Sequence, residues 1–245
     1  MTSRVLVHVP HGSRTIPADV RSGIVLSDAD LERELDLMTD SLTEELARAV
    51  SDSVLAAPVS RLVVDVERFP DDRESMNAVG MGAVYTRTHD GRVLRDTADP
   101  TLLDRWFHPH AAAVTAQVDA TLAEHGRAVL LDLHSYPRTR LPYELAAAAA
   151  ARPQVCLGTD PFHTPPWLVA AGREAFEGWD VALDSPFAGT YVPLTHYGTD
   201  ARVASLMVEL RRDAYLDEAT VRATAGFDEV VTRLALLVDA LARGT

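Results

Sequence analysis

The chain has 245 residues, 47% of them hydrophobic, and its 36 acidic against 23 basic side chains give a formal net charge of −13 at pH 7. Nucleic acid and anionic membranes both reward clustered cations, so this acidic balance excludes them as expected partners. No apolar run is long enough to cross a bilayer, no secretion signal is recognisable, and the single cysteine, Cys156, has no disulfide partner. We therefore expect one cytoplasmic domain over residues 1–245.

Apolar, β-rich runs predict strands along the whole chain. In chain order they are Val5–Val9, Leu62–Val66, a weaker run near Val84, Ala128–Leu133, a weaker run near Val155, Val181–Asp184 and Ser205–Leu210.

Helical periodicity occupies the stretches between these runs. Ser27 is a candidate N-cap for a helix whose apolar residues recur at helical spacing: Leu31, Leu35, Met38, Leu42 and Leu46. Similar spacing predicts helices over Leu103–His125 and Ala219–Arg243, and the alanine run Ala146–Ala151 is expected to be a helix end or a loop. Long apolar strands interleaved with helices favour an α/β fold with a mainly parallel sheet covered on both faces.

The residues that follow the predicted strands carry most of the functional information, because ligands of open α/β sheets bind at the carboxyl ends of the strands. Polar groups follow four of these strands: His11 and Ser13; Asp65, Glu67 and Arg68; Asp132, His134 and Ser135; and Glu209, Arg211 and Arg212. We expect these side chains to converge at one edge of the sheet.

Two histidines and a carboxylate are the usual ligands of a catalytic zinc ion, which leaves a fourth position for water. His11 and His134 could supply the imidazoles, and a further carboxylate could take the proton of that water. Asp132 lies two residues before His134, on the same side of the strand, and could orient its imidazole. The alternative is that each histidine lies at a loop end and makes ordinary hydrogen bonds.

The pattern leaves the third ligand open. Glu32, Asp36 and Asp40 share one face of the predicted helix at i, i+4 spacing, while Glu34 lies on its other flank. A solvated acidic face is the alternative explanation for this spacing.

Six short motifs occur along the chain in this order: "VPHGSRTIP", "ELDLMTD", "SRLVVDVERFPDD", "LLDLHSYP", "SPFAGTYVPLTHYG" and "VELRRDAYLDE". As an ordered set covering nearly the whole chain, they resemble the N-formylglutamate amidohydrolase family. That family is similar in fold to the zinc carboxypeptidases and aspartoacylases. The resemblance therefore implies a phosphorylase/hydrolase-like α/β fold, with a mixed, mainly parallel central sheet and helices on both faces.

By motif position, the resemblance implies that His11, Asp36 and His134 bind one zinc ion and that Glu209 is the general base. The implied reaction is hydrolysis of a linear amide C–N bond by zinc-activated water. Its substrate would be a small N-formyl or N-acyl amino acid such as N-formylglutamate, cleaved to formate, or another acid, and the free amino acid. A zinc carboxypeptidase-like peptidase and a non-catalytic binding module on the same scaffold are the alternatives, and the oligomeric state is left open.

Two arginines fall where the family places cations. By the resemblance, Arg61 and Arg68 would bind a substrate carboxylate, and Arg68 would also stabilise the oxyanion, since a planar guanidinium can donate two hydrogen bonds to a carboxylate. The alternative for each is a structural ion pair with a neighbouring carboxylate such as Asp65.

Three positions depart from the pattern of the family. Glu67 replaces an asparagine beside the expected site, while Ala188 and Thr195 stand where family members have basic residues. One carboxylate gained and two cations lost predict the same chemistry on a substrate less acidic than N-formylglutamate.

Overall fold

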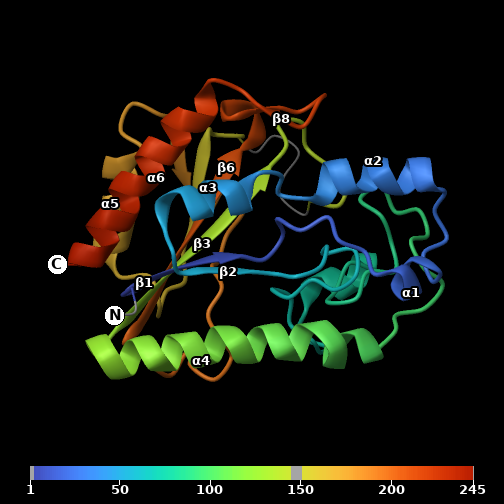
Figure 1. Ribbon diagram of the computed structural model, residues 1–245, viewed down its shortest axis with the longest axis horizontal. Helices are drawn as coiled ribbons and strands as arrows, with labels where there is room; N and C mark the ends of the chain where they lie inside the picture. The colour runs from blue at the N-terminus through green and yellow to red at the C-terminus, as the bar shows by residue number, and fades with distance from the viewer. Residues whose placement is uncertain (1–2, 145–150, 245) are drawn as a thin grey trace.

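The computed structural model describes residues 3–144 and 151–244 and is built on a six-stranded sheet (Figure 1). Its strands lie in the order β2 (Val54–Ala56), β1 (Val5–Val9), β3 (Ala128–Tyr136), β6 (Val203–Arg211), β4 (Val155–Gly158) and β5 (Val181–Leu183). Neighbouring strands are parallel except for β4 and β6, which pair antiparallel. The predicted α/β fold with a mixed, mainly parallel sheet is confirmed.

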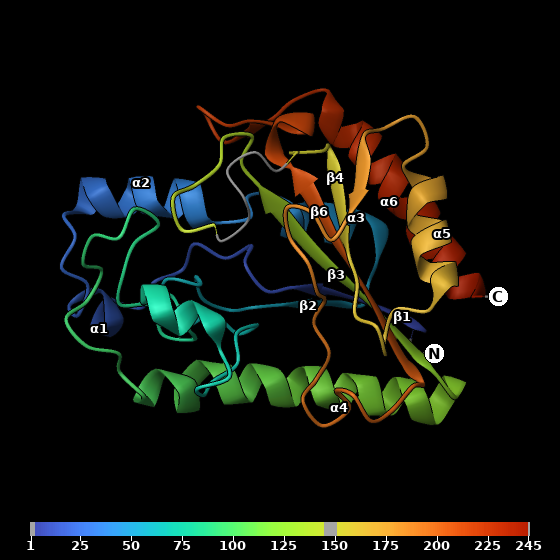
Figure 2. The ribbon, with the colours of Figure 1, turned by 180° about the vertical axis from the view of Figure 1, so that it is seen from behind.

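Helices cover both faces of the sheet, as the apolar strands predicted (Figures 1 and 2). One face packs against α3 (Thr43–Val50), α5 (Pro166–Ala175) and α6 (Gly226–Arg243), and the other against α4 (His108–His125). Alternation along β1 explains the two cores: Val5, Val7 and Val9 pack toward α3 and α6, whereas Leu6 packs toward α4.

A smaller core lies beyond the carboxyl end of β1. It is formed by α2 (Asp28–Met38), with the short α1 (Ala18–Arg21) nearby, and by the long segment 57–100, whose only helix among the described residues is the 3₁₀ turn Ser75–Val79. Leu35 and Met38 of α2 pack there against buried Tyr85. This smaller core therefore encloses the edge of the sheet that carries the carboxyl ends of the parallel strands.

The segment Leu62–Val66 is not a strand, so that prediction is wrong. The backbone N–H groups of Val63 and Val64 both donate to the carbonyl of Ser60, at 2.8 and 3.3 Å, which makes a turn. The guanidinium of buried Arg95 satisfies the carbonyls of Leu62 and Val63 in place of a neighbouring strand. A short apolar run satisfies a buried turn as well as a buried strand, so its composition alone could not separate the two.

Five of the other predicted strands are present in the structure. β1 has the expected bounds, and the runs predicted at residues 128–133, near Val155, at 181–184 and at 205–210 correspond to β3, β4, β5 and β6, of which β3 and β6 are longer than predicted. The weak run near Val84 forms no strand, and the short β2 was not predicted.

The long helix predicted after Ser27 is two helices. The Ser27 hydroxyl accepts a hydrogen bond from the N–H of Asp30 at 3.1 Å and so caps α2 as expected, but the helix ends at Met38. Leu42, with a left-handed φ of 64°, then opens α3. The predicted C-terminal helix starts at Gly226 because residues 216–223 form the hairpin of β7 (Leu216–Asp217) and β8 (Arg222–Ala223).

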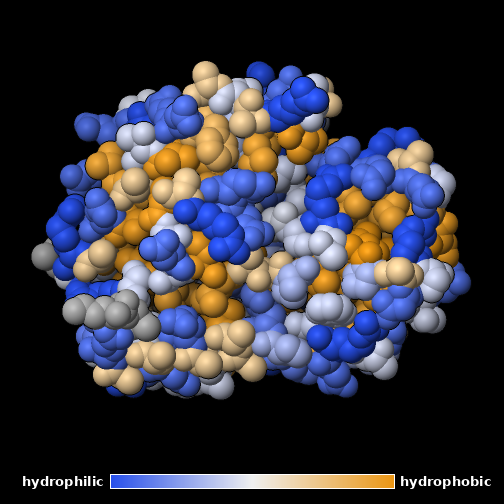
Figure 3. Space-filling model, in the orientation of Figure 1, coloured by the Kyte–Doolittle hydropathy of each residue, from blue (hydrophilic) through white to orange (hydrophobic). Residues whose placement is uncertain are grey.

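The helix predicted over Leu103–His125 is confirmed as a π-helical turn, Leu103–Phe107, that continues into α4. Residues 146–150 of the alanine run lie outside the described residues. None of the described helices combines the length and apolarity needed to span a membrane. Hydrophilic side chains cover much of the face seen in Figure 3, and hydrophobic ones show between them.

Candidate metal centre and active site

Four side chains meet at the carboxyl edge of the sheet. His11 follows β1, His134 lies near the end of β3, and Glu209 is its neighbour on the parallel strand β6. Asp40 comes from the turn between α2 and α3, and its N–H donates to the carbonyl of His11 at 3.0 Å. The parallel strands and this one backbone bond therefore position the site.

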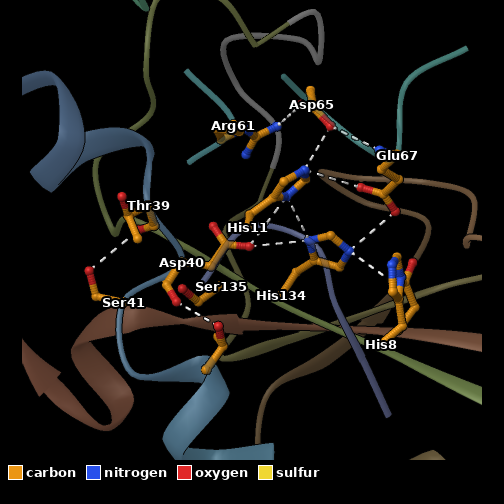
Figure 4. A network of polar contacts seen from close by, with 12 residues as sticks. His8, His11, Thr39, Asp40, Ser41, Arg61, Asp65, Glu67, His134 and Ser135 are labelled. Atoms are coloured by element: carbon orange, nitrogen blue, oxygen red, sulfur yellow. Dashed lines mark hydrogen bonds and ion pairs between the residues drawn. The ribbon is translucent and has the colours of Figure 1, made fainter. Parts of the chain in front are cut away.

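The Nδ1 atoms of His11 and His134 point at each other and at the carboxylate of Asp40 (Figure 4). The two nitrogens are 3.2 Å apart, and Asp40 Oδ2 lies 3.2 Å from His134 Nδ1 and 3.6 Å from His11 Nδ1. Zinc bound tetrahedrally at about 2.0–2.1 Å separates neighbouring ligand atoms by about 3.3 Å. These three buried donors therefore fit a zinc ion in both chemistry and spacing.

The far nitrogens of both imidazoles face carboxylates. His11 Nε2 lies 2.9 Å from Asp65 Oδ1, and His134 Nε2 lies 3.3 Å from Asp132 Oδ1 and 3.2 Å from Glu67 Oε1. A proton on His11 Nε2 donates to Asp65, whereas His134 Nε2 lies at ion-pair distance from its two carboxylates without a hydrogen bond to either. In both rings the negative charge on the Nε2 side favours the proton there and leaves the Nδ1 lone pair free for a metal. Burial alone would lower the pKa of His134, but Glu67 and Asp132 raise it well above its ordinary value.

Glu67 offers a second way to complete a metal site. One atom each of His11, Glu67 and His134 lies within 4.8 Å of the others, with Glu67 on the Nε2 side of both rings. His11 Nε2 is already hydrogen bonded to Asp65. The set with Asp40 leaves that bond intact and has shorter separations, so it fits a metal better than the set with Glu67.

The structure does not bring Asp36 to the histidines, which corrects the expectation that it completes the metal site. Its side chain is 46% exposed on α2 and forms an ion pair with Arg14 at 2.8 Å. The alternative, Glu34, is buried but accepts hydrogen bonds from the backbone N–H and Nδ1 of His89, at 2.7 and 2.6 Å. Asp40 lies one turn farther on, where the helix has ended and the chain turns toward β1.

Glu209 is a buried acid beside this donor set. Its side-chain atom Oε2 is enclosed and has no hydrogen-bond partner among the described residues. Burial raises the pKa of Glu209 to about 8, and the nearby carboxylates of Asp40 and Glu67 add to the effect. A carboxyl group that titrates near neutrality and faces a cavity is suited to proton transfer.

The two expected arginines have different surroundings. Arg61 is buried and donates to Asp65 Oδ2 at 2.8 Å and to the Tyr85 hydroxyl at 3.0 Å, so the structural ion pair considered from the sequence is present. Arg68 is a quarter exposed and lies 3.6 Å from both Asp65 and Glu74, too far for direct hydrogen bonds. Arg68 therefore has N–H groups that a ligand could engage.

Arg212 was not among the expected site residues, although it follows a predicted strand. Its guanidinium donates to the carbonyl of Leu37 at 2.8 Å and to Ser135 Oγ at 3.2 Å, and it lies 3.4 Å from Asp40 Oδ1. It thus holds the oxygen of Asp40 that faces away from the histidines.

A buried chain of side chains extends from His134 toward α4. Asp132 Oδ1 accepts a hydrogen bond from His8 Nδ1 at 2.8 Å, and His8 Nε2 lies 3.0 Å from His110 Nε2. Burial, with the neighbouring His8, lowers the pKa of His110 to about 3, so His110 is neutral. The expected contact between Asp132 and His134 is present, but the two further histidines were missed. The sequence signal that could have indicated His8 is the alternation of side chains along β1, which places it on the side of the strand that faces α4.

A cavity of about 830 Å³ opens over the site. It is lined by the donor set, by Glu209, by arginines, by α4 and by aromatic side chains of the segments 66–75 and 187–197. Its volume lies within the usual range for small-molecule pockets, about 300–1,000 Å³.

Comparison with known proteins places the chain in a family. The sequence profile of the N-formylglutamate amidohydrolase family matches residues 3–216. An N-formylglutamate deformylase of Pseudomonas aeruginosa is 29% identical over 232 residues, and one of Pseudomonas putida is 27% identical over 229 residues. Each comparison covers 87% of this chain and 82% of the relative.

Solved structures share the fold. An N-formylglutamate amidohydrolase from Ralstonia eutropha JMP134 superimposes with a TM-score of 0.83 at 23% identity, covering 98% of this chain and 93% of that one. A gene product of Agrobacterium tumefaciens gives a TM-score of 0.72 at 18% identity, covering 98% and 91%. The family match spans most of the chain and confirms the resemblance of the six motifs. The chain belongs to the N-formylglutamate amidohydrolase family.

Proposed function

We propose that the protein is a zinc-dependent amidohydrolase that cleaves the amide bond of an N-formyl or N-acyl amino acid, such as N-formylglutamate. The products are formate, or another acid, and the free amino acid. The observation that supports this most is the convergence of His11 Nδ1, His134 Nδ1 and Asp40 Oδ2 beside the unpartnered carboxyl of Glu209. The deformylase activity named for the two Pseudomonas relatives agrees with it.

His11, Asp40 and His134 would hold the zinc ion, because two imidazoles and one carboxylate suit zinc and leave a position for water or substrate. When bound, zinc lowers the pKa of a water molecule and polarises the carbonyl of the substrate. Asp65 accepts the proton of His11 Nε2, and the carboxylates of Asp132 and Glu67 beside His134 Nε2 favour the same tautomer, which presents Nδ1, in the second ring. Arg212 keeps Asp40 turned toward the histidines.

Glu209 acts as the general base and then as the general acid. It takes the proton of the attacking water on Oε2 and passes it to the leaving nitrogen, which must be protonated to depart as an amine. A pKa raised to about 8 by burial brings both transfers near neutral pH. Arg68 donates hydrogen bonds to the substrate, either to its α-carboxylate or to the oxygen that gains charge in the tetrahedral intermediate.

Two matched substitutions test the metal site. Asp40→Asn removes the proposed ligand, whereas Asp36→Asn makes the same chemical change on the exposed face of α2. After zinc loading and desalting, metal analysis is expected to find close to one zinc per chain in the wild type and in Asp36→Asn, and little in Asp40→Asn. Retention of zinc by Asp40→Asn together with its loss from Asp36→Asn would contradict the assignment.

Formate release from N-formyl amino acids tests the reaction. Glu209→Gln is expected to retain zinc and to lose a factor of about 10² to 10⁴ in turnover, the usual contribution of a proton-transferring group. Wild-type turnover in Glu209→Gln would remove this residue from the mechanism. Cleavage of unmodified dipeptides without formate release would favour a peptidase, and zinc binding without any turnover would favour a binding module.

A further inference from the structure

We propose that the preferred substrate is an N-formyl or N-acyl amino acid with a large apolar side chain, and that this side chain binds in an apolar lobe of the cavity. The inference rests on the proposed function, because it concerns the amino-acid part of the same substrate. We define the apolar lobe by six lining residues: Phe69, Phe107, Ala111, Ala112, Leu194 and Tyr197.

The wall of the lobe is built from three separate segments. Phe107 begins the side of α4 that faces the cavity, and small side chains, including Ala111 and Ala112, follow it. An ion pair at 2.9 Å between Asp119 of α4 and His196 ties the segment that carries Leu194 and Tyr197 to that helix. The ring of Phe69 meets that of Tyr197 edge-on, with centroids 6.2 Å apart.

Large apolar groups of this wall are left open to solvent. Leu194 is 46% exposed and Tyr197 is 41% exposed, although both line the cavity. Exposed apolar surface that continues into a concave active site indicates a binding surface for an apolar group.

The arginines of the cavity are already paired with carboxylates. The chain contains no lysine, so an anionic side chain would need an arginine or a protonated histidine. The arginines that line the cavity have these partners: Arg61 with Asp65 at 2.8 Å, Arg73 with Asp71 at 2.6 Å, Arg212 with Asp40 at 3.4 Å, and Arg68 with Asp65 and Glu74 at 3.6 Å. Arg68 has the loosest pairing and can serve one substrate carboxylate, the α-carboxylate common to all amino acids.

A second substrate carboxylate would meet unfavourable charge. Six carboxylates line the cavity: Asp40, Glu67, Glu74, Asp119, Asp160 and Glu209. Ala188 and Thr195, which also line it, provide no cation where the family pattern has basic residues. An apolar substrate side chain is not repelled by these carboxylates, and its burial against the apolar lobe contributes favourable binding free energy. The cavity therefore favours an apolar side chain over a glutamate side chain.

Binding and turnover together test the proposal. We would measure, by calorimetry, the binding of N-formyl-L-phenylalanine, N-formyl-L-leucine, N-formylglycine and N-formyl-L-glutamate to zinc-loaded Glu209→Gln, whose expected turnover is about 10²- to 10⁴-fold slower than that of the wild type. Burial of a Leu or Phe side chain predicts that the two apolar compounds bind roughly 10- to 100-fold more tightly than N-formylglycine. Formate release by the wild-type enzyme should follow the same order in kcat/KM.

Three surface substitutions locate the effect. Leu194→Asp, placed in the Glu209→Gln background, should reduce the preference for phenylalanine over glycine at least fivefold. The matched change Leu236→Asp lies on α6 at a site 56% exposed and should leave that preference unchanged. Thr195→Arg should shift the preference toward N-formyl-L-glutamate by adding a cation to the wall of the cavity.

The outcomes separate this proposal from the proposed function. Tighter binding and faster turnover of N-formyl-L-glutamate than of N-formyl-L-phenylalanine would overturn the apolar lobe while keeping the amidohydrolase. A binding preference for the apolar compounds that depends on Leu194, with no formate released from any of them, would support the lobe and reject the proposed reaction.

Discussion

Replacement of Asp132 by asparagine is expected to weaken zinc binding without touching a proposed ligand. Asp132 is fully buried, and its Oδ1 faces His8 Nδ1 at 2.8 Å and His134 Nε2 at 3.3 Å. Its Oδ2 accepts the backbone N–H of Tyr191 at 2.9 Å. The two hydrogen-bond partners, His8 Nδ1 and the Tyr191 N–H, are both donors, so an isosteric asparagine must turn its amide NH₂ toward one of them.

The magnitude follows from these contacts. One buried donor loses its acceptor in either orientation of the amide, which costs about 1–3 kcal/mol of unfolding free energy. One of the two carboxylates that face His134 Nε2 is lost as well, and the loss of a group that orients a ligand typically lowers metal affinity by about 10- to 100-fold. We therefore expect Asp132→Asn to fold, with both its stability and its zinc affinity reduced.

The assay combines urea unfolding of the zinc-free protein with zinc competition against a chromogenic chelator. Asp28→Asn is the matched control, because Asp28 is 94% exposed and pairs only with Arg21 among the described residues. If Asp132→Asn and Asp28→Asn bound zinc with the same affinity, the role of Asp132 in orienting His134 would be refuted. A loss of unfolding free energy without a loss of zinc affinity would not support that role.

Three further predictions follow from other contacts. Tyr85→Phe removes a hydroxyl that donates to Asp65 and accepts from Arg61, and should lower the urea unfolding free energy by about 1–3 kcal/mol; an unchanged midpoint would contradict this. The hydrogen bond to Glu34 raises the pKa of His89 above 6.5, so its stabilisation is full below pH 6.5 and is lost as the pH rises through the raised pKa. The stability gap between wild type and His89→Gln should therefore narrow from pH 6 to pH 9, and a widening gap would reverse the reasoning. Removal of zinc by a chelator should lower the melting temperature, since a ligand at 100 times its Kd contributes about 2.7 kcal/mol; equal melting curves would argue against a bound metal.

Much of the site could be predicted because it follows from strand order. His11, His134 and Glu209 each lie near the carboxyl end of a strand that was recognisable from its composition, and parallel pairing of β1, β3 and β6 brings those ends together. No side-chain pattern was needed for that convergence, only the topology of an α/β sheet.

The third proposed metal ligand, Asp40, could not be predicted because its position depends on a break between two helices. The apolar periodicity of the sequence runs through this break and gives no sign of it. Leu42 continues the apolar spacing of α2, so the sequence reads as one helix in which Asp36 and Asp40 share a face. The structure interrupts the helix after Met38, and the left-handed φ of Leu42 turns the chain before α3 starts. Asp36 then stays in solvent while Asp40 reaches the histidines, a separation set by tertiary contacts rather than by local propensity.

Buried charge gives an independent reason to expect a cation at this edge. Four carboxylates are buried here: Asp40, Asp65, Asp132 and Glu209. Arg61 and Arg212 are the buried guanidinium groups that lie against them, one at Asp65 and one at Asp40.

The negative charge that these two arginines leave uncompensated must be neutralised by protons or by a metal ion, because an unpaired buried charge is costly. Without a metal, protons held by His134 and Glu209, whose pKa values are raised, can neutralise the charge. With a metal, the ion bound by His11, Asp40 and His134 can do so. Two of these carboxylates lie on strands and two in turns packed against the strand ends, so the acidity of the cluster and its fit to zinc both result from the convergence at this edge.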